Sequence, residues 1–315
     1  MKKRAITAII LFLILIPIVS IEDFLPLFQV VMTFFVLIAS SEMIRMYETG
    51  KKFTKIVKVG IVFLTLATFF SVGGVVDFSE EIQNPLQAKG VLNITIPLLT
   101  LILFSFLVLF REFNGEDVGK ALTVINYVGL GAASIVILRF LGVRFIVYLL
   151  LISSLTDTFA YLFGVKFGRN KMIPHISPKK TWEGAIGGTI LATIIASIFA
   201  LFYGSFFVPG TLLGDTLNAS GERTLLANFS SLGENTSLWL QALVLVPVTF
   251  LASIFAQIGD LVASKLKRTY GIKDFGSILP GHGGLLDRFD SILFVAMFLT
   301  AIFILIHYFY PAVIV

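Results

Sequence analysis

The sequence predicts an all-α integral membrane protein, a polytopic bundle of helices, and three observations support this. Of the 315 residues, 57% are hydrophobic and only 14% are charged, and the mean hydropathy is +0.96. A water-soluble domain has about a quarter charged residues, so this composition disfavours a soluble enzyme. The apolar residues are gathered in runs of about 20, the length that crosses roughly 30 Å of hydrocarbon as a helix. No strand-like alternation typical of an outer-membrane barrel is found in these runs.

Nine segments are apolar enough to span a membrane, and turn or charge clusters separate them. The segments are 5–21, 24–40, 56–72, 91–110, 121–141, 144–166, 184–206, 238–262 and 290–310. The first could be misread as a signal peptide, because Lys2, Lys3 and Arg4 precede it. However, no small-residue cleavage site follows, and a second apolar run comes after Glu22. We therefore expect a retained first helix.

The distribution of basic residues predicts the orientation. With the N-terminus in the cytoplasm, 20 of the 24 Lys and Arg residues fall on the inside. Lys89, Arg139, Arg144 and Arg223 remain outside. The positive-inside rule thus favours nine spans, with the C-terminus outside. We expect one domain over 1–315, with the N-terminal spans in 1–143 and the polar motifs among the spans and cytoplasmic loops of 144–315.

Cysteine and histidine usage restricts the chemistry. The chain has no Cys, which excludes disulfides, thiolate zinc sites, iron–sulfur clusters and cysteine nucleophiles. Only three His are present, namely His175, His282 and His307. A metal would therefore be held mainly by oxygen ligands, which favours a hard ion such as Mg²⁺.

The most polar stretch surrounds the loop between the last two predicted spans. Asp260 lies near the end of one span and Asp287 near the start of the next, so both carboxylates are expected at similar depth on the cytoplasmic side. On a helix, Asp260, Ser264 and the pair Lys267–Arg268 share one face. One interpretation is two carboxylates that bind hard cations beside cationic groups that bind phosphates. The alternative is Asp–Lys or Asp–Arg pairs that join two helix ends.

A glycine-rich segment, Pro280-Gly-His282-Gly-Gly284, lies between these two aspartates. Such a segment lets backbone N–H groups approach an anion closely. A simple turn is the alternative for the glycines, and for His282 the alternative is a hydrogen-bonding role in the loop. Lys273 and Asp274 precede the segment, and Arg288 follows it.

A second polar group begins inside the predicted span 144–166. Asp157 is an intramembrane acid, which indicates a functional site unless a buried cation or a proton neutralises it. In the following loop, Ser177-Pro178 has the pattern of an N-cap followed by proline in the first helical turn. Lys179 and Lys180 would then lie at a helix N-terminus, which favours phosphate binding. Ordinary topology signals are the alternative for these lysines.

Two motifs carry a resemblance to a known family. One has the form S-x-x-K-R-x4-K-D-x-G-x3-P-G-H-G-G-x-x-D-R-x-D and runs from Ser264 to Asp290; the other combines Asp157–Gly164 with Ile176–Gly184. In both, the chain resembles the bacterial phosphatidate cytidylyltransferases, or CDP-diacylglycerol synthases. The resemblance implies transfer of the cytidylyl group of CTP to phosphatidate, which gives CDP-diacylglycerol and pyrophosphate by metal-assisted in-line displacement.

The resemblance also implies roles for individual residues. Asp260 and Asp287 would bind the metal, with Mg²⁺ as the principal ion and a second cation left open. Together with Lys267, Arg268 and Asp157 they form the expected catalytic set. The expected substrate-binding residues are Ser177, Lys179, Lys180, Thr181, Ser264, Lys273, Asp274, His282, Gly283, Gly284 and Arg288.

The expected partners follow from this reaction. They are CTP and a membrane phosphatidate; no nucleic acid is expected, and a homodimer is left open. The expected location is the cell membrane, with the active site facing the cytoplasm. A CTP-dependent polyprenol kinase is the rival enzyme, and a transporter that uses Asp157 as an ion or proton relay is the rival from another class.

Overall fold

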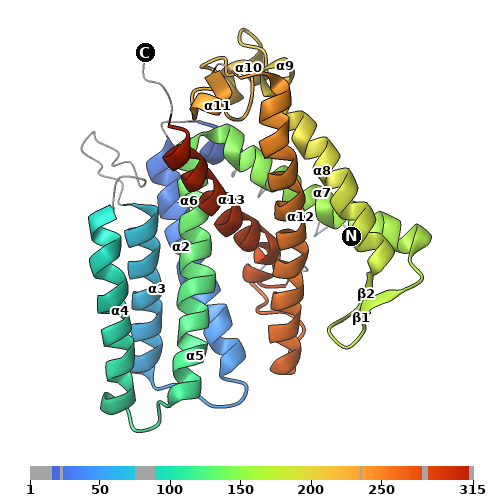
Figure 1. Cartoon of the computed structure of the whole chain (residues 1–315). Helices are drawn as coiled ribbons and strands as arrows, with labels where there is room; N and C mark the ends of the chain where they lie inside the picture. The colour runs from blue at the N-terminus through green and yellow to red at the C-terminus, as the bar shows by residue number, and fades with distance from the viewer. Residues whose placement is uncertain (1–15, 22–23, 75–88, 235, 279–282, 312–315) are drawn as a thin grey trace. The chain divides into compact units, whose positions relative to one another are not determined.

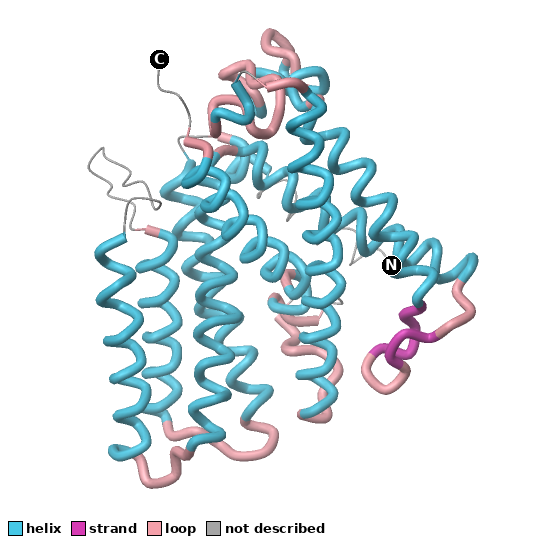
Figure 2. Tube along the Cα trace, in the orientation of Figure 1, coloured by secondary structure: helices cyan, strands magenta, loops and turns pink. Residues whose placement is uncertain are grey.

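The computed structural model describes residues 16–21, 24–74, 89–234, 236–278 and 283–311. Helices dominate this part of the chain, and its only two strands form one hairpin (Figures 1 and 2). The helices are α2 (Leu25–Tyr47), α3 (Lys55–Gly73), α4 (Lys89–Leu109), α5 (Gly115–Val124), the π-helical η3 (Ile125–Leu130), α6 (Gly131–Leu141), α7 (Val143–Phe167), α8 (Trp182–Leu201), α9 (Tyr203–Phe206), α10 (Leu212–Leu217), α11 (Ser231–Glu234), α12 (Leu238–Thr269), the 3-10 turn η4 (Leu286–Arg288) and α13 (Asp290–Phe309). The strands are β1 (Lys171–Ile173) and β2 (Ser177–Thr181).

Seven helices of the described residues are long and apolar enough to cross a membrane: α2, α3, the continuous helix of α5, η3 and α6, then α7, α8, α12 and α13. The protein is therefore a polytopic, helical membrane protein. In α4 the apolar stretch 96–109 is shorter than these seven. Most of the predicted span 5–21 lies outside the described residues, so the total of nine spans stays a prediction.

Several predicted spans differ in length from the helices, and α12 and α8 show both directions of the difference. α12 ends at Thr269, seven residues beyond the predicted boundary at 262. The apolar run ends near this boundary, but the polar residues that follow it continue the helix. α8 ends at Leu201, five residues before the predicted boundary at 206, and the separate helix α9 follows.

The chain forms two compact units. Unit 1 comprises 1–18, 23–137 and 266–289, and unit 2 comprises 19–22, 138–265 and 290–315. The boundary between Lys265 and Leu266 falls inside α12. A compact unit need not fold independently, so the single domain over 1–315 stays a prediction.

In unit 1, α3 and α4 lie side by side, and α3 also packs against η3 (Figure 1). Gly129 of η3 permits this second contact, because a Cβ there would lie 2.9 Å from the carbonyl oxygen of Thr65. At one end of the unit, α5 starts with a capping box between Asn114 and Asp117. Lys51 ties the preceding α2–α3 loop to this point through an ion pair of 2.7 Å with Asp117.

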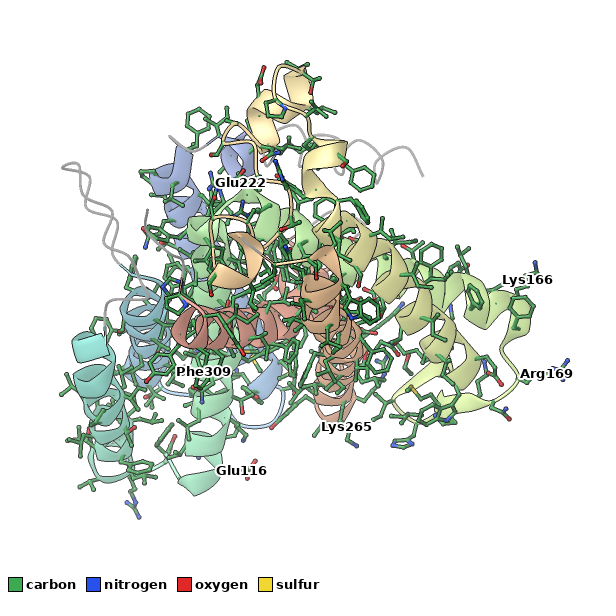
Figure 3. The ribbon with its side chains drawn as sticks, turned by 45° about the horizontal axis from the view of Figure 1, so that its top comes forward. Glu116, Lys166, Arg169, Glu222, Lys265 and Phe309 are labelled. Atoms are coloured by element: carbon green, nitrogen blue, oxygen red, sulfur yellow. The ribbon has the colours of Figure 1, made fainter. Side chains whose placement is uncertain are left out.

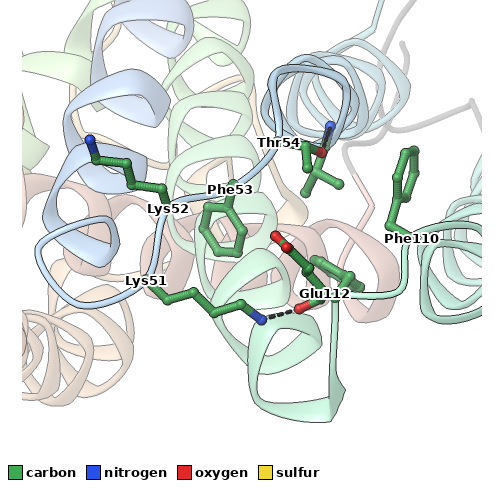
Figure 4. A pocket seen from close by; sticks show the side chains of 8 residues that line it. Lys51, Lys52, Phe53, Thr54, Phe110 and Glu112 are labelled. Carbon is green, nitrogen blue, oxygen red and sulfur yellow. Dashed lines mark hydrogen bonds between the residues drawn. The ribbon is translucent and has the colours of Figure 1, made fainter.

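A small pocket lies beside this ion pair, between the loop before α3 and the loop after α4 (Figure 4). Phe53 and Phe113 form part of its wall, and Lys51 donates a hydrogen bond to the backbone carbonyl of Glu112 beside it. The lysine is therefore already engaged by two acceptors.

In unit 2, α7 and α8 approach unusually closely. A Cβ at Gly188 would lie 2.8 Å from the carbonyl oxygen of Thr156, and a Cβ at Gly184 would overlap the α7 backbone near Ala160. Small residues let backbones pack closely in membrane helices, so these glycines set the spacing of the pair. The pairing fixes the part of α7 that carries Asp157.

Residues 203–234, which include α9, α10 and α11, cover one end of unit 2 (Figure 1). Buried Arg144 at the start of α7 pairs with Glu222 at 2.9 Å and donates to the carbonyl of Ala227 at 2.7 Å. The hydroxyl of Tyr203, a buried residue, donates a hydrogen bond to the carbonyl of Leu217. Glu222 lies at the opposite end of unit 2 from Lys166 and Arg169 (Figure 3).

Candidate active site

The segment before α8 differs from the sequence prediction. Ser177 does not cap a helix, because Ser177–Thr181 is the extended strand β2, paired with β1. The helix begins at Trp182, and Thr181 is its N-cap, with its hydroxyl accepting the N–H of Gly184 at 3.2 Å. The pairing with β1 explains the difference, because it holds Ser177–Thr181 in extended backbone. Lys179 and Lys180 therefore lie on a strand and not in a first helical turn.

The end of β2 brings Lys180 to α12. Its ammonium forms an ion pair with Oδ2 of Asp260, and both side chains remain partly exposed, at 27% and 29%. Among the described residues, Oδ1 of Asp260 accepts no hydrogen bond. Gly259 brings this part of α12 close to the start of α13, because a Cβ there would lie 2.9 Å from the carbonyl oxygen of Asp290. Asp260 is thus held by one flexible cation and keeps an open oxygen.

Asp157 belongs to the same part of unit 2. The charges of Asp260 and Lys180 both act on its carboxylate. The hydroxyl of Ser291, at the start of α13, donates to Asp157 at 3.4 Å and also contacts the hydroxyl of Ser153 at 3.0 Å. Unit 2 therefore brings together two of the predicted carboxylates and one predicted lysine.

Asp287 lies in η4 of unit 1 and is held quite differently. Its side chain is 5% exposed, and Oδ1 forms an ion pair of 2.6 Å with Lys267, whose side chain is 10% exposed. Oδ2 accepts the backbone N–H of Phe275 at 2.8 Å and that of Gly284 at 3.0 Å. The Lys267 ammonium also lies 4.9 Å from the centre of the Phe275 ring. The carboxylate therefore ties Lys267 of α12 to two backbone positions in the segment that follows this helix.

The remaining predicted residues have simpler surroundings. Arg268 donates to the carbonyl of Ile272 at 3.0 Å and is exposed. Lys273, Asp274 and Arg288 are exposed as well, whereas Ser264 and Gly283 are partly buried and Gly284 is buried. Lys179 on β2 is exposed. His282 lies outside the described residues.

Sequence reasoning missed Glu42 of α2. Its side chain is buried, at 1% exposed, and its two oxygens accept the N–H groups of Leu285 and Leu286, at 3.0 and 2.9 Å. The predicted span ended at residue 40, which left Glu42 in a supposed loop. Because α2 continues to Tyr47, Glu42 is an acidic residue within a long apolar helix. An acidic residue in such a helix indicates a functional site, and the sequence already contained this signal.

The carboxylates of the described residues do not gather into a large metal cluster. No three of the His, Asp and Glu side chains in this part of the chain come together as a possible metal group. Mg²⁺ is commonly held by only one or two carboxylates, with water and substrate phosphates completing its shell. Asp260 fits such a site, since its carboxylate side chain is 29% exposed.

Comparison with known proteins decides the family. The model of the "Cytidylyltransferase family" matches residues 2–307. The chain belongs to this family. Among curated proteins, it is similar to the phosphatidate cytidylyltransferase of Staphylococcus haemolyticus, with 35% identity over 306 residues, and to that of Staphylococcus aureus (strain COL), with 35% identity over 311 residues. Each alignment covers 96% of this chain and 99% of the relative.

The family match gives the site geometry its context. It spans both units, and both resemblance motifs lie within it. The two groups of polar side chains, around Asp260 in unit 2 and around Asp287 in unit 1, are therefore both parts of one cytidylyltransferase chain.

Proposed function

We propose that the protein transfers the cytidylyl group of CTP to phosphatidate and so produces CDP-diacylglycerol and pyrophosphate. The observation that carries this proposal is the match over nearly the whole chain to the cytidylyltransferase family and to relatives named phosphatidate cytidylyltransferase. Seven membrane-type helices are what an enzyme with a lipid substrate needs, because the acyl chains stay in the bilayer while the nucleotide arrives from water.

The proposed setting is the cell membrane, with nine spans and a cytoplasmic N-terminus. It is supported by the 20 basic residues that this orientation assigns to the inside. The two polar groups then face the cytoplasm, where CTP is found. A reporter fused after Val315 should be located outside, and a cytoplasmic signal would contradict the nine-span arrangement. A homodimer stays a prediction.

Asp260 and Asp287 are the proposed carboxylates for Mg²⁺. The supporting argument is chemical: the chain has no Cys and few His, and oxygen ligands suit a hard cation. When bound, the ion supplies charge stabilisation for phosphate oxygens. Asp260 has an open oxygen for this role, whereas Asp287 accepts three donors and would have to share Oδ1 with Lys267.

The basic side chains bind and orient the phosphates in this proposal. Attack of a phosphatidate oxygen on the α-phosphorus of CTP increases negative charge on the non-bridging and leaving oxygens. Lysine and arginine side chains already in place stabilise that charge without reorganisation. Lys180 and Lys267 are suited to this because each is held by a carboxylate. Lys179, Arg268, Lys273 and Arg288 are exposed and can reach incoming phosphates.

Cytidylyl transfer is tested with CTP labelled at the α-phosphorus. Purified protein in mixed micelles with phosphatidate should place the label in the lipid product and release unlabelled pyrophosphate. A polyprenol kinase would leave all label in CDP, and a transporter would leave CTP unchanged. Either of these results would contradict the proposal. The Asp260→Asn variant, purified in the same way, is the control for a contaminating activity.

A further inference from the structure

Glu42 reaches the loop of Asp287 from a distant part of the sequence. It is located on α2, about one turn before the helix ends, and its two carboxylate oxygens accept two consecutive backbone N–H groups. These N–H groups belong to Leu285 and Leu286, the two residues directly before Asp287. Among the described residues no Lys or Arg forms an ion pair with Glu42. Within the part of the chain that the structure describes, the side-chain oxygens of Glu42 accept hydrogen bonds from the two N–H groups of this turn.

A buried carboxylate without a cation is costly, so its partners must compensate well. Desolvation costs several kcal/mol for an ion, and charge-assisted hydrogen bonds are the strong kind that can offset it. Leu285 and Leu286 stand at the first turn of η4, where N–H groups have no partner within the turn. Glu42 supplies the acceptors that this turn lacks.

Two glycines of the same loop leave room for the carboxylate. A Cβ at Gly284 would lie 2.7 Å from Oε2 of Glu42 and 2.6 Å from the backbone nitrogen of Gly276. A Cβ at Gly276 would overlap Oε1 of Glu42. These close approaches explain the two glycines by their contact with Glu42, whether or not Gly284 also touches a phosphate.

Other contacts hold the same segment along α2. The rings of Phe35 and Phe289 lie 4.6 Å apart, and those of Tyr47 and Tyr270 lie 5.0 Å apart. α2 therefore contacts the segment 270–289 near both of its ends. Glu42 is the polar contact between them, and it lies next to Asp287.

We propose that Glu42 is a positioning residue of the cytidylyltransferase reaction. It fixes the turn 283–288, so that Asp287 keeps its contacts with Lys267 and with the N–H groups of Phe275 and Gly284. This proposal rests on the proposed function, because it assigns Asp287 and its neighbours to that reaction. Glu42 itself touches neither substrate in this role.

The test compares Glu42→Gln and Glu42→Asp with the matched control Glu48→Gln. Glu48 directly follows α2, pairs with Lys58 at 2.7 Å and accepts the N–H of Phe53 at 3.1 Å, so it is also a partly buried carboxylate that holds a backbone N–H. Gln offers one acceptor oxygen and turns an NH₂ group toward the second N–H, whereas Asp keeps the charge on a shorter side chain. The measurements are kcat per folded molecule, hydrogen exchange of the peptide 283–289 and the midpoint of thermal unfolding in detergent.

For Glu42→Gln we expect faster hydrogen exchange at the N–H groups of Leu285 and Leu286. We also expect kcat to fall about 10- to 100-fold, which is the usual loss when a side chain that supports a metal ligand is removed. Glu42→Asp should recover part of kcat, and Glu48→Gln should match the wild type. Gly284→Ala should lower kcat by disturbing the same contact, so its effect should not multiply with that of Glu42→Gln.

Two results would overturn the proposal. One is wild-type kcat in Glu42→Gln despite faster exchange, which would show that the turn need not be fixed. The other is a loss of activity fully explained by the loss of folded protein, which would make Glu42 only a stabilising residue. If the wild type transfers no label to lipid, the proposed function fails instead, and the exchange measurement still reports whether Glu42 holds the turn.

Discussion

Asp260 and Asp287 lie near the two ends of one polar stretch of the sequence, yet the protein holds them in opposite ways. Asp260 in unit 2 is partly exposed and has a single lysine partner. Asp287 in unit 1 is buried and accepts a lysine and two backbone N–H groups. A partly exposed ion pair contributes little to stability, whereas a buried network is costly to break. Asp260 is therefore a side chain available to a ligand, and Asp287 also determines the fold of its loop.

The largest expected effect is on the free energy of unfolding, and it differs between variants of the two aspartates. Asp287→Asn removes the carboxylate that pairs with buried Lys267, and we expect a loss of about 3–5 kcal/mol in the free energy of unfolding. Asp260→Asn should change this free energy by at most about 1 kcal/mol. Both variants should lose cytidylyl transfer. Denaturant or thermal unfolding in detergent measures the difference, and equal losses would show that the two sites are not held differently.

The lysines sharpen the same comparison. Lys267→Met should cost about 2–3 kcal/mol, less than Asp287→Asn, because the two backbone N–H groups still stabilise Oδ2 of Asp287. Lys180→Met should cost less than about 1 kcal/mol. If the lysines bind phosphates, both variants should raise KM for CTP. An unchanged KM in Lys180→Met would exclude that lysine from phosphate binding and leave it only its ion pair with Asp260.

Metal removal tests whether the open oxygen of Asp260 has the proposed role. With CTP present, Mg²⁺ at ten times its dissociation constant should stabilise the wild type by about 1.4 kcal/mol. Chelation should reverse this gain, and Asp260→Asn should not show it at the same Mg²⁺ concentration. Because the readout is unfolding, it does not depend on turnover. An equal gain in Asp260→Asn would remove this carboxylate from the metal site.

The sequence predicted the helices well because membrane spans have a strong physical signature. Seven of the predicted spans are found as membrane-type helices, since long apolar runs can satisfy their backbone in lipid only as helices or closed barrels. The polar ends were predicted less well. The pattern Ser177-Pro178 suggested a helix start, but β1 pairs with this segment, and a pairing partner is not visible in local sequence.

Glu42 illustrates the second limit. Its partners lie 243 and 244 residues away and are backbone N–H groups, which carry no residue signature. The lysine partners of the two aspartates were among the residues that the sequence singled out, because basic side chains lie in the same polar stretches as the predicted site. The sequence could not show which lysine pairs with which aspartate, because the pairing depends on how the loops fold back.

The smallest expected effect concerns Thr181, which follows Lys180 at the start of α8. Its side chain is buried and caps the helix through the N–H of Gly184, so Thr181→Ala should cost about 1 kcal/mol. Thr181→Ser keeps the capping oxygen and should cost less. Because the cap fixes the backbone beside Lys180, kcat should fall only a few-fold. If Thr181→Ala instead abolishes transfer without a change in stability, the hydroxyl contacts substrate, and unit 2 then contributes a buried group to the chemistry, as is proposed for Asp287 of unit 1.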